Sequence, residues 1–545
     1  AQITASVTGP GIETPIQATG SVSTASGLTL SGVPEGDQRV VTVLGAMESD
    51  NTQLFSRESA ISILPQQELL LDMLLVPRND FGCLEVHTEF GNLLFPAIVG
   101  LPDGKVVIAG GYQSVSPVGE TFELTSPSDK VFIFDGRTGT FQRVPEVMSA
   151  GRGAASAMYI PGHRKVLIVG GAKKLRYDPA SGKFPFSFIG TDALQSYEVM
   201  SMEALEQRAN NIVGAACATD DDCTSESDIC LGSGTCGLPV FVPAFEEAGT
   251  PNRMNLGRVF PQLLLLASDD AVLVTGGGSW PQDSDPAFQY AEYYHPKAFT
   301  EPISGKTVGG FVDSGNKLGQ LGPRTGHTIT PMGITDAGYT RALMWGGSAS
   351  DPAEIFEQGT ASGVEIWGRF LNVVLSGDAD KSTYFHSAVS LSSKKVLVVG
   401  GAKATGGQLS VPTEGEAYIL EYSSVEGVAM INAKAVPGLA TNSYFGALGV
   451  SNDARYGTLV GGWSDNAGTP NTQVLVADLL AAEPLFEDAG VSHDGAGGMA
   501  SVVLPNDALL LIGGTPNITT FDSSVYGRAE TFAPQVLATE LDTVQ

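Results

Sequence analysis

The stretch Lys105–Gly111 reads KVVIAGG, and Lys165–Gly171 reads KVLIVGG. Each stretch is an apolar run that ends in two glycines. Consecutive apolar residues are typical of a strand that is buried on both faces. Glycine permits a positive φ at a sharp turn and leaves room where backbones crowd together. One such run could end any strand, so its recurrence decides what fold the sequence predicts.

The apolar run with its glycine pair occurs seven times in the chain. The runs read VVIAGG, VLIVGG, VLVTGG, ALMWGG, VLVVGG, GTLVGG and LLLIGG, with the pairs Gly110 and Gly111, Gly170 and Gly171, Gly276 and Gly277, Gly346 and Gly347, Gly400 and Gly401, Gly461 and Gly462, and Gly513 and Gly514. The spacing runs from 52 residues (461 to 513) to 70 (276 to 346), with one gap of 106 (170 to 276). A repeat of this kind indicates a single repeat architecture for most of the chain.

Other parts of the unit recur around the glycines. An upstream strand opens with small residues and a basic or His residue, in SAGRGAASAMYI, NLGRVFPQLLLL, GPRTGHTITPM and YFHSAVSLSS. A third strand follows in VFIFDGRTGTF, LRYDPASGKF, AEYYHPKAF, AEIFEQG, EAYILEY and AETFAP. The Asp-Gly and Asp-Pro dipeptides are typical of hairpin turns, after which Phe141 or Phe184 starts a fourth strand.

These units resemble kelch repeats, whose pattern is an apolar strand, Gly-Gly, a strand like Glu-x-Tyr-Asp-Pro and a strand that ends in Trp. The resemblance covers roughly residues 80–545, although the final Trp is mostly Phe or absent and the unit around Gly461 lacks the Tyr-Asp-Pro element. It implies an all-β fold, a seven-bladed kelch β-propeller over residues 79–545. We expect the glycine-paired runs to be the inner strands of the blades.

A propeller closes its ring by pairing strands from the two ends of the chain. The stretch GCLEVHTEF, residues 82–90, has no partner strands of its own. We expect it to complete the blade built by LLLIGG and AETFAP. The tail QVLATELDTVQ, residues 535–545, is the alternative.

Residues 1–78 lack the glycine pairs and read as short alternating runs, such as ITASVTG, LTLSGV and RVVTVLGAM, between turn clusters. This pattern predicts a small Ig-like or transthyretin-like β-sandwich. It resembles the accessory sandwich modules that bacterial surface proteins place ahead of a larger domain.

The long gap between glycine pairs predicts an insertion at about residues 190–250. It holds ALQSYEVMSMEALEQRANNIVGAA, a predicted helix, and then the cluster Cys217, Cys223, Cys230 and Cys236. In a polar loop these cysteines favour two disulfides, with three possible pairings, and an oxidising compartment. A zinc site is the rival, but its cysteines usually stand closer together. We expect the remaining Cys83 to be a buried, inert thiol.

Charge and hydropathy limit the partners. The chain has 30 Lys plus Arg against 59 Asp plus Glu, a net charge of −29, which would repel nucleic acid and anionic membranes. No stretch reaches the roughly 20 apolar residues that span a bilayer. The sequence begins at Ala1, so an export signal or a lipid-anchored N-terminus could already have been removed. We expect a secreted, periplasmic or outer cell-surface protein that binds a protein partner or joins a larger surface assembly, with glycan as the alternative ligand.

One kelch enzyme family, the galactose oxidase type, also places a sandwich before its propeller. Its copper radical site implies two His, an axial Tyr and a Tyr cross-linked to Cys. The six histidines are His87, His163, His295, His327, His386 and His493, and three of these occupy repeat positions. Hydrolase motifs are absent from the sequence. We therefore expect a non-catalytic binding or scaffolding protein without metal, cofactor or catalytic residues, and a copper oxidase or another enzyme of the propeller face is the alternative.

Overall fold

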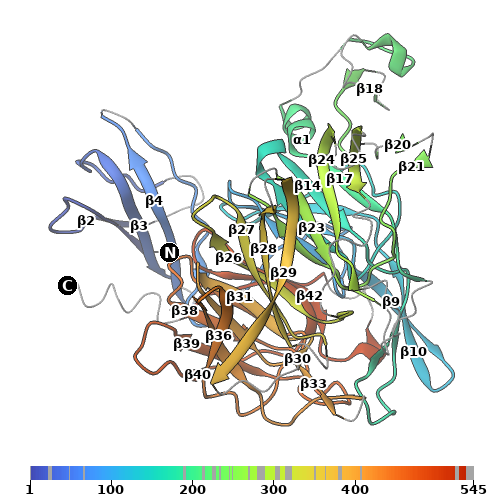
Figure 1. The fold of residues 1–545 in the computed structure, drawn as a ribbon. Helices are drawn as coiled ribbons and strands as arrows, with labels where there is room; N and C mark the ends of the chain where they lie inside the picture. The colour runs from blue at the N-terminus through green and yellow to red at the C-terminus, as the bar shows by residue number, and fades with distance from the viewer. Residues whose placement is uncertain are drawn as a thin grey trace.

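A computed structural model describes most of the chain. The described residues are 2–21, 27–47, 50–65, 68–187, 192–210, 215–223, 229–231, 235–242, 244, 246–247, 250–267, 270–278, 289–300, 307–312, 322–348, 352–361, 364–377, 383–405, 408–521 and 527–534. Their regular secondary structure is almost entirely β-strand (Figure 1). The helices among them are all too short, or too polar, to cross a bilayer.

The expected all-β propeller is confirmed, with one antiparallel repeat sheet for each glycine pair. The first four sheets contain β7 (Ala97–Gly100), β8 (Lys105–Ala109), β11 (Val131–Asp135) and β12 (Thr140–Arg143); β13 (Ser156–Ile160), β14 (Lys165–Val169) and β17 (Tyr197–Ser201); β22 (Gln262–Leu265), β23 (Val272–Thr275), β24 (Glu292–Thr300) and β25 (Thr307–Val312); and β26 (Thr328–Ile334), β27 (Thr340–Trp345), β28 (Ala353–Ala361) and β29 (Val364–Gly377). Phe141 lies in the fourth strand of its sheet, as expected.

The remaining repeat sheets follow the same order. They contain β31 (Ser387–Ser392), β32 (Lys395–Val399), β35 (Ala417–Val425) and β36 (Val428–Ala435); β37 (Ala447–Val450), β38 (Tyr456–Val460), β39 (Gln473–Asp478) and β40 (Phe486–Ser492); and β41 (Gly497–Val503), β42 (Leu509–Thr515), β43 (Ala529–Phe532) and β6 (Phe81–Cys83). The outer strands β29 and β36 pair in parallel, which joins two neighbouring sheets into one.

The strand upstream of each glycine-paired run lines the axis. The strands β7, β13, β22, β26, β31, β37 and β41 contact one another in turn, and β41 returns to β7. The glycine-paired strand is therefore second from the axis, and the expectation that it would be innermost is wrong. The physical reason is that the upstream strand brings the small residues that fit around the axis, while the strongly apolar run is buried between sheets.

The ring closes with the start of the predicted segment, at residues 82 and 83, whereas residues 84–90 form no strand. Strand β6 pairs with β43, with Cys83 opposite Glu530 and Phe81 opposite Phe532. The alternative closing segment, residues 535–545, lies outside the described residues.

The second repeat sheet departs from the expected order. The third strand is β17 rather than LRYDPASGKF, and it comes from the segment expected to be helical. The helix α1 covers only Met202–Ala209, and the side chain of Ser201 caps it by accepting from the Ala204 N–H. Residues 197–201 form a strand rather than a helix because pairing with β14 gives hydrogen-bond partners to the backbone N–H and C=O groups along the edge of that buried strand.

The segment LRYDPASGKF instead contributes to a separate sheet, which covers the end of the propeller where the glycine pairs lie; we call this end the glycine end. Its strands are β9 (Tyr112–Val118), β10 (Thr121–Pro127), β15 (Leu175–Tyr177) and β16 (Phe186–Ser187), and the nearby strands β30 (Thr383–Tyr384), β33 (Ala402–Thr405) and β34 (Gln408–Ser410) form another small sheet. Phe184 therefore packs beside this separate sheet, and the expectation that it starts a fourth strand of the repeat sheet is wrong.

The N-terminal segment forms one five-stranded sheet among the described residues. Its strands are β1 (Gln2–Thr8), β2 (Ile16–Ser21), β3 (Gly36–Ala46), β4 (Gln53–Ile63) and β5 (Val76–Pro77). Extended segments, with side chains such as Leu30 and Met73, cover the face where a sandwich would place a second sheet. The sheet contacts the propeller through Phe55, Val76 and the ion pair Arg57–Asp507.

Candidate binding surfaces and the axial ring

The glycine pairs connect each repeat sheet to the next. The second glycine of each pair donates its N–H to a carbonyl at the entry of the following sheet, in the bonds Gly111 to Arg152 (2.8 Å), Gly171 to Arg258 (2.8 Å), Gly277 to Arg324 (3.0 Å), Gly347 to Thr383 (2.9 Å), Gly401 to Ser443 (3.0 Å), Gly462 to Ala496 (2.9 Å) and Gly514 to Leu93 (2.8 Å). The last bond returns to the first sheet, so the glycine pairs form a closed circuit.

The first glycine of each pair has no room for a side chain. Gly400, with φ of 70°, would place a Cβ 1.9 Å from the carbonyl oxygen of Ser443. Gly513 would place one 1.9 Å from the carbonyl oxygen of Leu93. These glycines are needed because of conformation and close approach, and they are structural.

The basic residues of the upstream signature are buried in ion pairs. Arg152, Arg258 and Arg324 are fully buried, and each donates to the carbonyl of the first glycine in its own sheet. Each also pairs with a glutamate on the third strand; Arg258 and Glu292, for example, lie 2.8 Å apart. Each arginine side chain therefore links the second and third strands of its own sheet at the end where the glycine pairs lie.

Two of the repeat histidines have structural roles. His327 Nε2 shares a hydrogen bond of 2.9 Å with the Thr275 hydroxyl, and His386 Nε2 does the same with Thr328. Burial lowers the pKa of His386 to about 3 and holds that of His327 well below its usual value. Both rings are therefore neutral groups that link adjacent sheets.

The glycine end of the propeller axis is filled by aromatic side chains. Phe95, Phe260, Phe385 and Phe445 each lie two residues before an innermost strand, namely β7, β22, β31 and β37. We name these four residues the axial phenylalanine cluster. The ring centroids of Phe95 and Phe445 are 4.8 Å apart, and those of Phe95 and Phe260 are 5.1 Å apart. Phe184 of the covering segment stacks on Phe385 at 4.9 Å. The axis at this end is therefore closed by a packed apolar core.

Backbone hydrogen bonds hold the axial phenylalanine cluster. The Phe95 N–H donates to Gly498, the Ala154 N–H to Phe95, and the Phe260 N–H to Ala154. The cluster residues all have φ between 52° and 55°. Sequence reasoning missed this cluster, although a Phe at the start of the upstream strand in RVFPQ, YFHS and YFGA was a visible signal.

Three residues that a copper radical site could use have other places in the described part of the chain. The four phenylalanines of the axial cluster carry no donor atom, and the phenols of Tyr112, Tyr177 and Tyr444 belong to the same core. His327 and His386 are engaged with threonines. Cys83 is exposed on the outer strand β6, so the expectation of a buried thiol is wrong. It is exposed because β6 is the outermost strand of its sheet. His327, His386 and Cys83 therefore do not form a copper site with one another.

The expected disulfides are confirmed in the insertion. Cys217 bonds Cys230 and Cys223 bonds Cys236, which resolves the three pairings that the sequence left open. Cys230 lies in the short strand β18 (Ile229–Cys230), which pairs with β19 (Cys236–Gly237), the strand that contains Cys236. The sulfurs of Cys217, Cys223 and Cys236 lie within 4.8 Å of one another, as the rival zinc site would also require.

The insertion projects away from the axial phenylalanine cluster. Strand β17 runs from Tyr197, opposite Val169 near the glycine pair, to Ser201, opposite Lys165 at the far end of the sheet. Helix α1 and β18 continue outward from there (Figure 1). The sequence correctly placed an exposed element on one end of the propeller.

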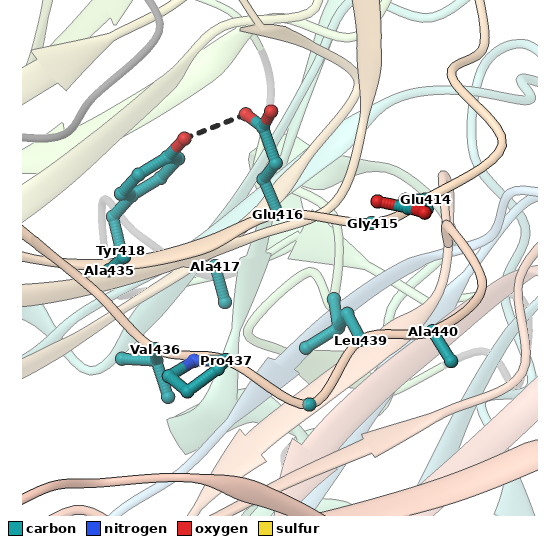
Figure 2. A pocket seen from close by; sticks show the side chains of 11 residues that line it. Glu414, Gly415, Glu416, Ala417, Tyr418, Ala435, Val436, Pro437, Leu439 and Ala440 are labelled. Atoms are coloured by element: carbon teal, nitrogen blue, oxygen red, sulfur yellow. Dashed lines mark hydrogen bonds between the residues drawn. The ribbon is translucent and has the colours of Figure 1, made fainter.

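A groove lies beside strands β35 and β36 of the fifth repeat sheet. It has a volume of about 460 Å³ and is lined by residues 414–418 and 435–440 (Figure 2). The Tyr418 hydroxyl donates to Glu416 at 2.8 Å, and Lys403 pairs with the other oxygen of that carboxylate. We refer to it as the 414–440 groove.

Comparison with known proteins gives structural likenesses only. No family model and no curated protein matches the chain. Among solved structures, a fungal alcohol oxidase of the AA5 family in complex with copper is similar at 11% identity and a TM-score of 0.45, covering 84% of this chain and 76% of that one. YjhT is similar at 10% identity and a TM-score of 0.37, covering 73% of this chain and 97% of that one.

Proposed function

We propose that the chain is a non-catalytic binding or scaffolding protein of the cell surface or extracellular space. The observation that carries this proposal is the axial phenylalanine cluster, which fills one end of the axis with apolar rings. Phe95 and Phe385 are buried there beneath a covering sheet. Ligands of enzymes bind in hollows where a few polar groups converge. A closed apolar axis suits a rigid frame that presents its rim and projecting elements.

The projecting elements supply the binding surface of the proposed function. The insertion carries α1 and the disulfide-linked strands β18 and β19. The two disulfides are compatible with an oxidising compartment. The N-terminal sheet then spaces or anchors the propeller, with protein as the partner and glycan as the alternative ligand.

Metal content and partner binding test this proposal together. Purified protein should contain no stoichiometric copper and should consume no oxygen with primary alcohols or galactose. A variant in which a short Gly-Ser linker replaces residues 211–239 should lose its native partner while keeping the unfolding midpoint of the propeller. Stoichiometric copper with alcohol oxidation would establish the oxidase instead.

A further inference from the structure

The shape of the 414–440 groove is fixed by the backbone. The Gly415 N–H donates to the Leu439 carbonyl at 3.2 Å, and the Val436 N–H donates to Ala417 at 2.8 Å. Gly438 has a φ of 110°, and a Cβ there would lie 2.0 Å from the carbonyl oxygen of Phe486. A groove that is formed before binding loses little ordering entropy when a ligand enters it.

One wall of the groove is apolar. Val436 and Leu439 are buried in the core between two repeat sheets, and Pro437 and Ala440 form the exposed lip. Residues 435–440 read AVPGLA, so this wall has no charged or hydrogen-bonding side chain. An aliphatic chain is the kind of group that such a wall accommodates.

The other wall carries carboxylates. Glu416 is held in place by Tyr418 and Lys403, whereas Glu414 is exposed. Figure 2 shows both carboxylates on the 414–418 side, opposite the apolar wall. The groove thus combines an apolar track with an acidic end.

We propose that the 414–440 groove binds an arginine side chain from an extended basic segment of a protein partner, an inference that rests on the proposed binding function. The methylene stem lies along Pro437 and Ala440, because long cationic side chains pack their stems on apolar surface. The guanidinium donates to the Glu414 carboxylate, with which its planar fork can form two hydrogen bonds.

The charge of the whole protein favours the same class of partner. A net charge of −29 attracts cationic segments over a distance and repels nucleic acid and anionic lipid. A small metal ion would leave the apolar wall unused. A basic protein segment uses both walls.

Binding of a labelled peptide to the full chain tests the proposal. The probe is fluorescein-labelled Gly-Arg-Gly-Arg-Gly-amide, followed by anisotropy at low salt, with Gly-Lys-Gly-Lys-Gly-amide and Gly-Glu-Gly-Glu-Gly-amide as comparison peptides. We expect saturable binding of the arginine peptide, weaker binding of the lysine peptide and none of the glutamate peptide. Glu414→Gln should weaken arginine-peptide binding about tenfold, the loss of one charged hydrogen bond.

Two further variants separate the groove from bulk charge. Glu421→Gln removes an equal charge from an exposed position further along β35 and should leave binding unchanged. Ala440→Phe changes no charge but narrows the groove and should also weaken binding. The proposal would be overturned if Glu414→Gln and Glu421→Gln lowered the affinity for the arginine peptide equally. It would also be overturned if Ala440→Phe left that affinity unchanged, or if the unmodified chain did not bind the peptide.

The native partner distinguishes this inference from the proposed function. If the partner is lost on replacement of residues 211–239 but retained by Glu414→Gln, the binding function stands and the groove assignment is wrong. If the protein oxidises alcohols with bound copper, the proposed function itself is wrong, whatever the peptide does.

Discussion

The repeat sheets and the insertion are held together by different means. Each repeat sheet buries a strongly apolar strand and joins its neighbour through a glycine N–H, as at Gly401 and Ser443. The strands β18 and β19 of the insertion have two residues each, and disulfides hold them. A segment that buries apolar surface can rely on packing, whereas a short polar segment needs a covalent link. The variants below test that difference.

The largest effect should come from adding one methyl group to the circuit of glycine pairs. In Gly400→Ala the new Cβ would lie 1.9 Å from the Ser443 carbonyl oxygen, so the two sheets must separate. We expect a loss of about 5 kcal/mol in the free energy of unfolding, or no folded protein. Denaturant unfolding measures it.

The matched control for this substitution is Gly182→Ala. Gly182 has a φ of 66°, close to the 70° of Gly400, but nothing lies within 4 Å of its Cβ position. Only the cost of the left-handed conformation remains, about 1 kcal/mol. Equal losses in the two variants would show that close approach between sheets does not stabilise the ring.

The buried arginines should produce the next largest effect. Arg324→Met removes the guanidinium that pairs with the buried Glu354 carboxylate and should cost about 4 kcal/mol. Adding Glu354→Leu should recover much of the loss, because no buried charge then remains. Arg369→Met, which removes an exposed pair with Glu357, should cost less than about 1 kcal/mol. No recovery in the double variant would contradict the ion-pair explanation.

Removing the disulfides should affect the insertion alone. Replacing Cys217, Cys223, Cys230 and Cys236 by Ser should lower local protection by about 3 kcal/mol. Amide exchange should then rise in residues 216–237, while the unfolding midpoint of the propeller stays in place. A propeller midpoint that falls in parallel would mean that the insertion and the ring unfold as one unit.

The pH dependence should show a smaller effect on the ring. The pKa of His386 is about 3 in the folded protein, below its unfolded value near 6.5, so the unfolded state binds more protons between these values. The contribution of His386 is full above pH 6.5 and falls by about 2 kcal/mol between pH 7 and pH 5. His386→Gln should reduce that slope in denaturant unfolding; an unchanged slope would contradict a neutral buried ring.

The sequence allowed much of the fold to be predicted. The glycine pairs, the closing strand at residue 83 and the disulfide cluster are visible because each depends on residue types with few alternatives. The helix prediction failed at Tyr197–Ser201 because edge pairing with β14 outweighed the local pattern. The prediction that the Cys83 thiol is buried was also wrong, because apolar neighbours in the sequence do not indicate which strand of a sheet is outermost.

The candidate sites could be predicted only in part. The insertion was visible as an excess of chain between Gly170 and Gly276. The axial phenylalanine cluster was not predicted, because its members lie far apart in the chain and meet only around the axis. The 414–440 groove depends on the contact between Gly415 and Leu439, which no local pattern encodes.

The sequence by itself determined an all-β repeat with a glycine pair in every unit and a covalently held insertion. Backbone conformation and burial restrict which residue type fits at a position, so a residue such as Gly400, which has a positive φ and is buried, can be recognised in the sequence. Only the tertiary structure decided which strand lines the axis, where β17 pairs and what fills the axis. Those outcomes depend on which of several compatible partners offers the best packing and hydrogen bonding, and that competition is resolved only when the whole ring is assembled.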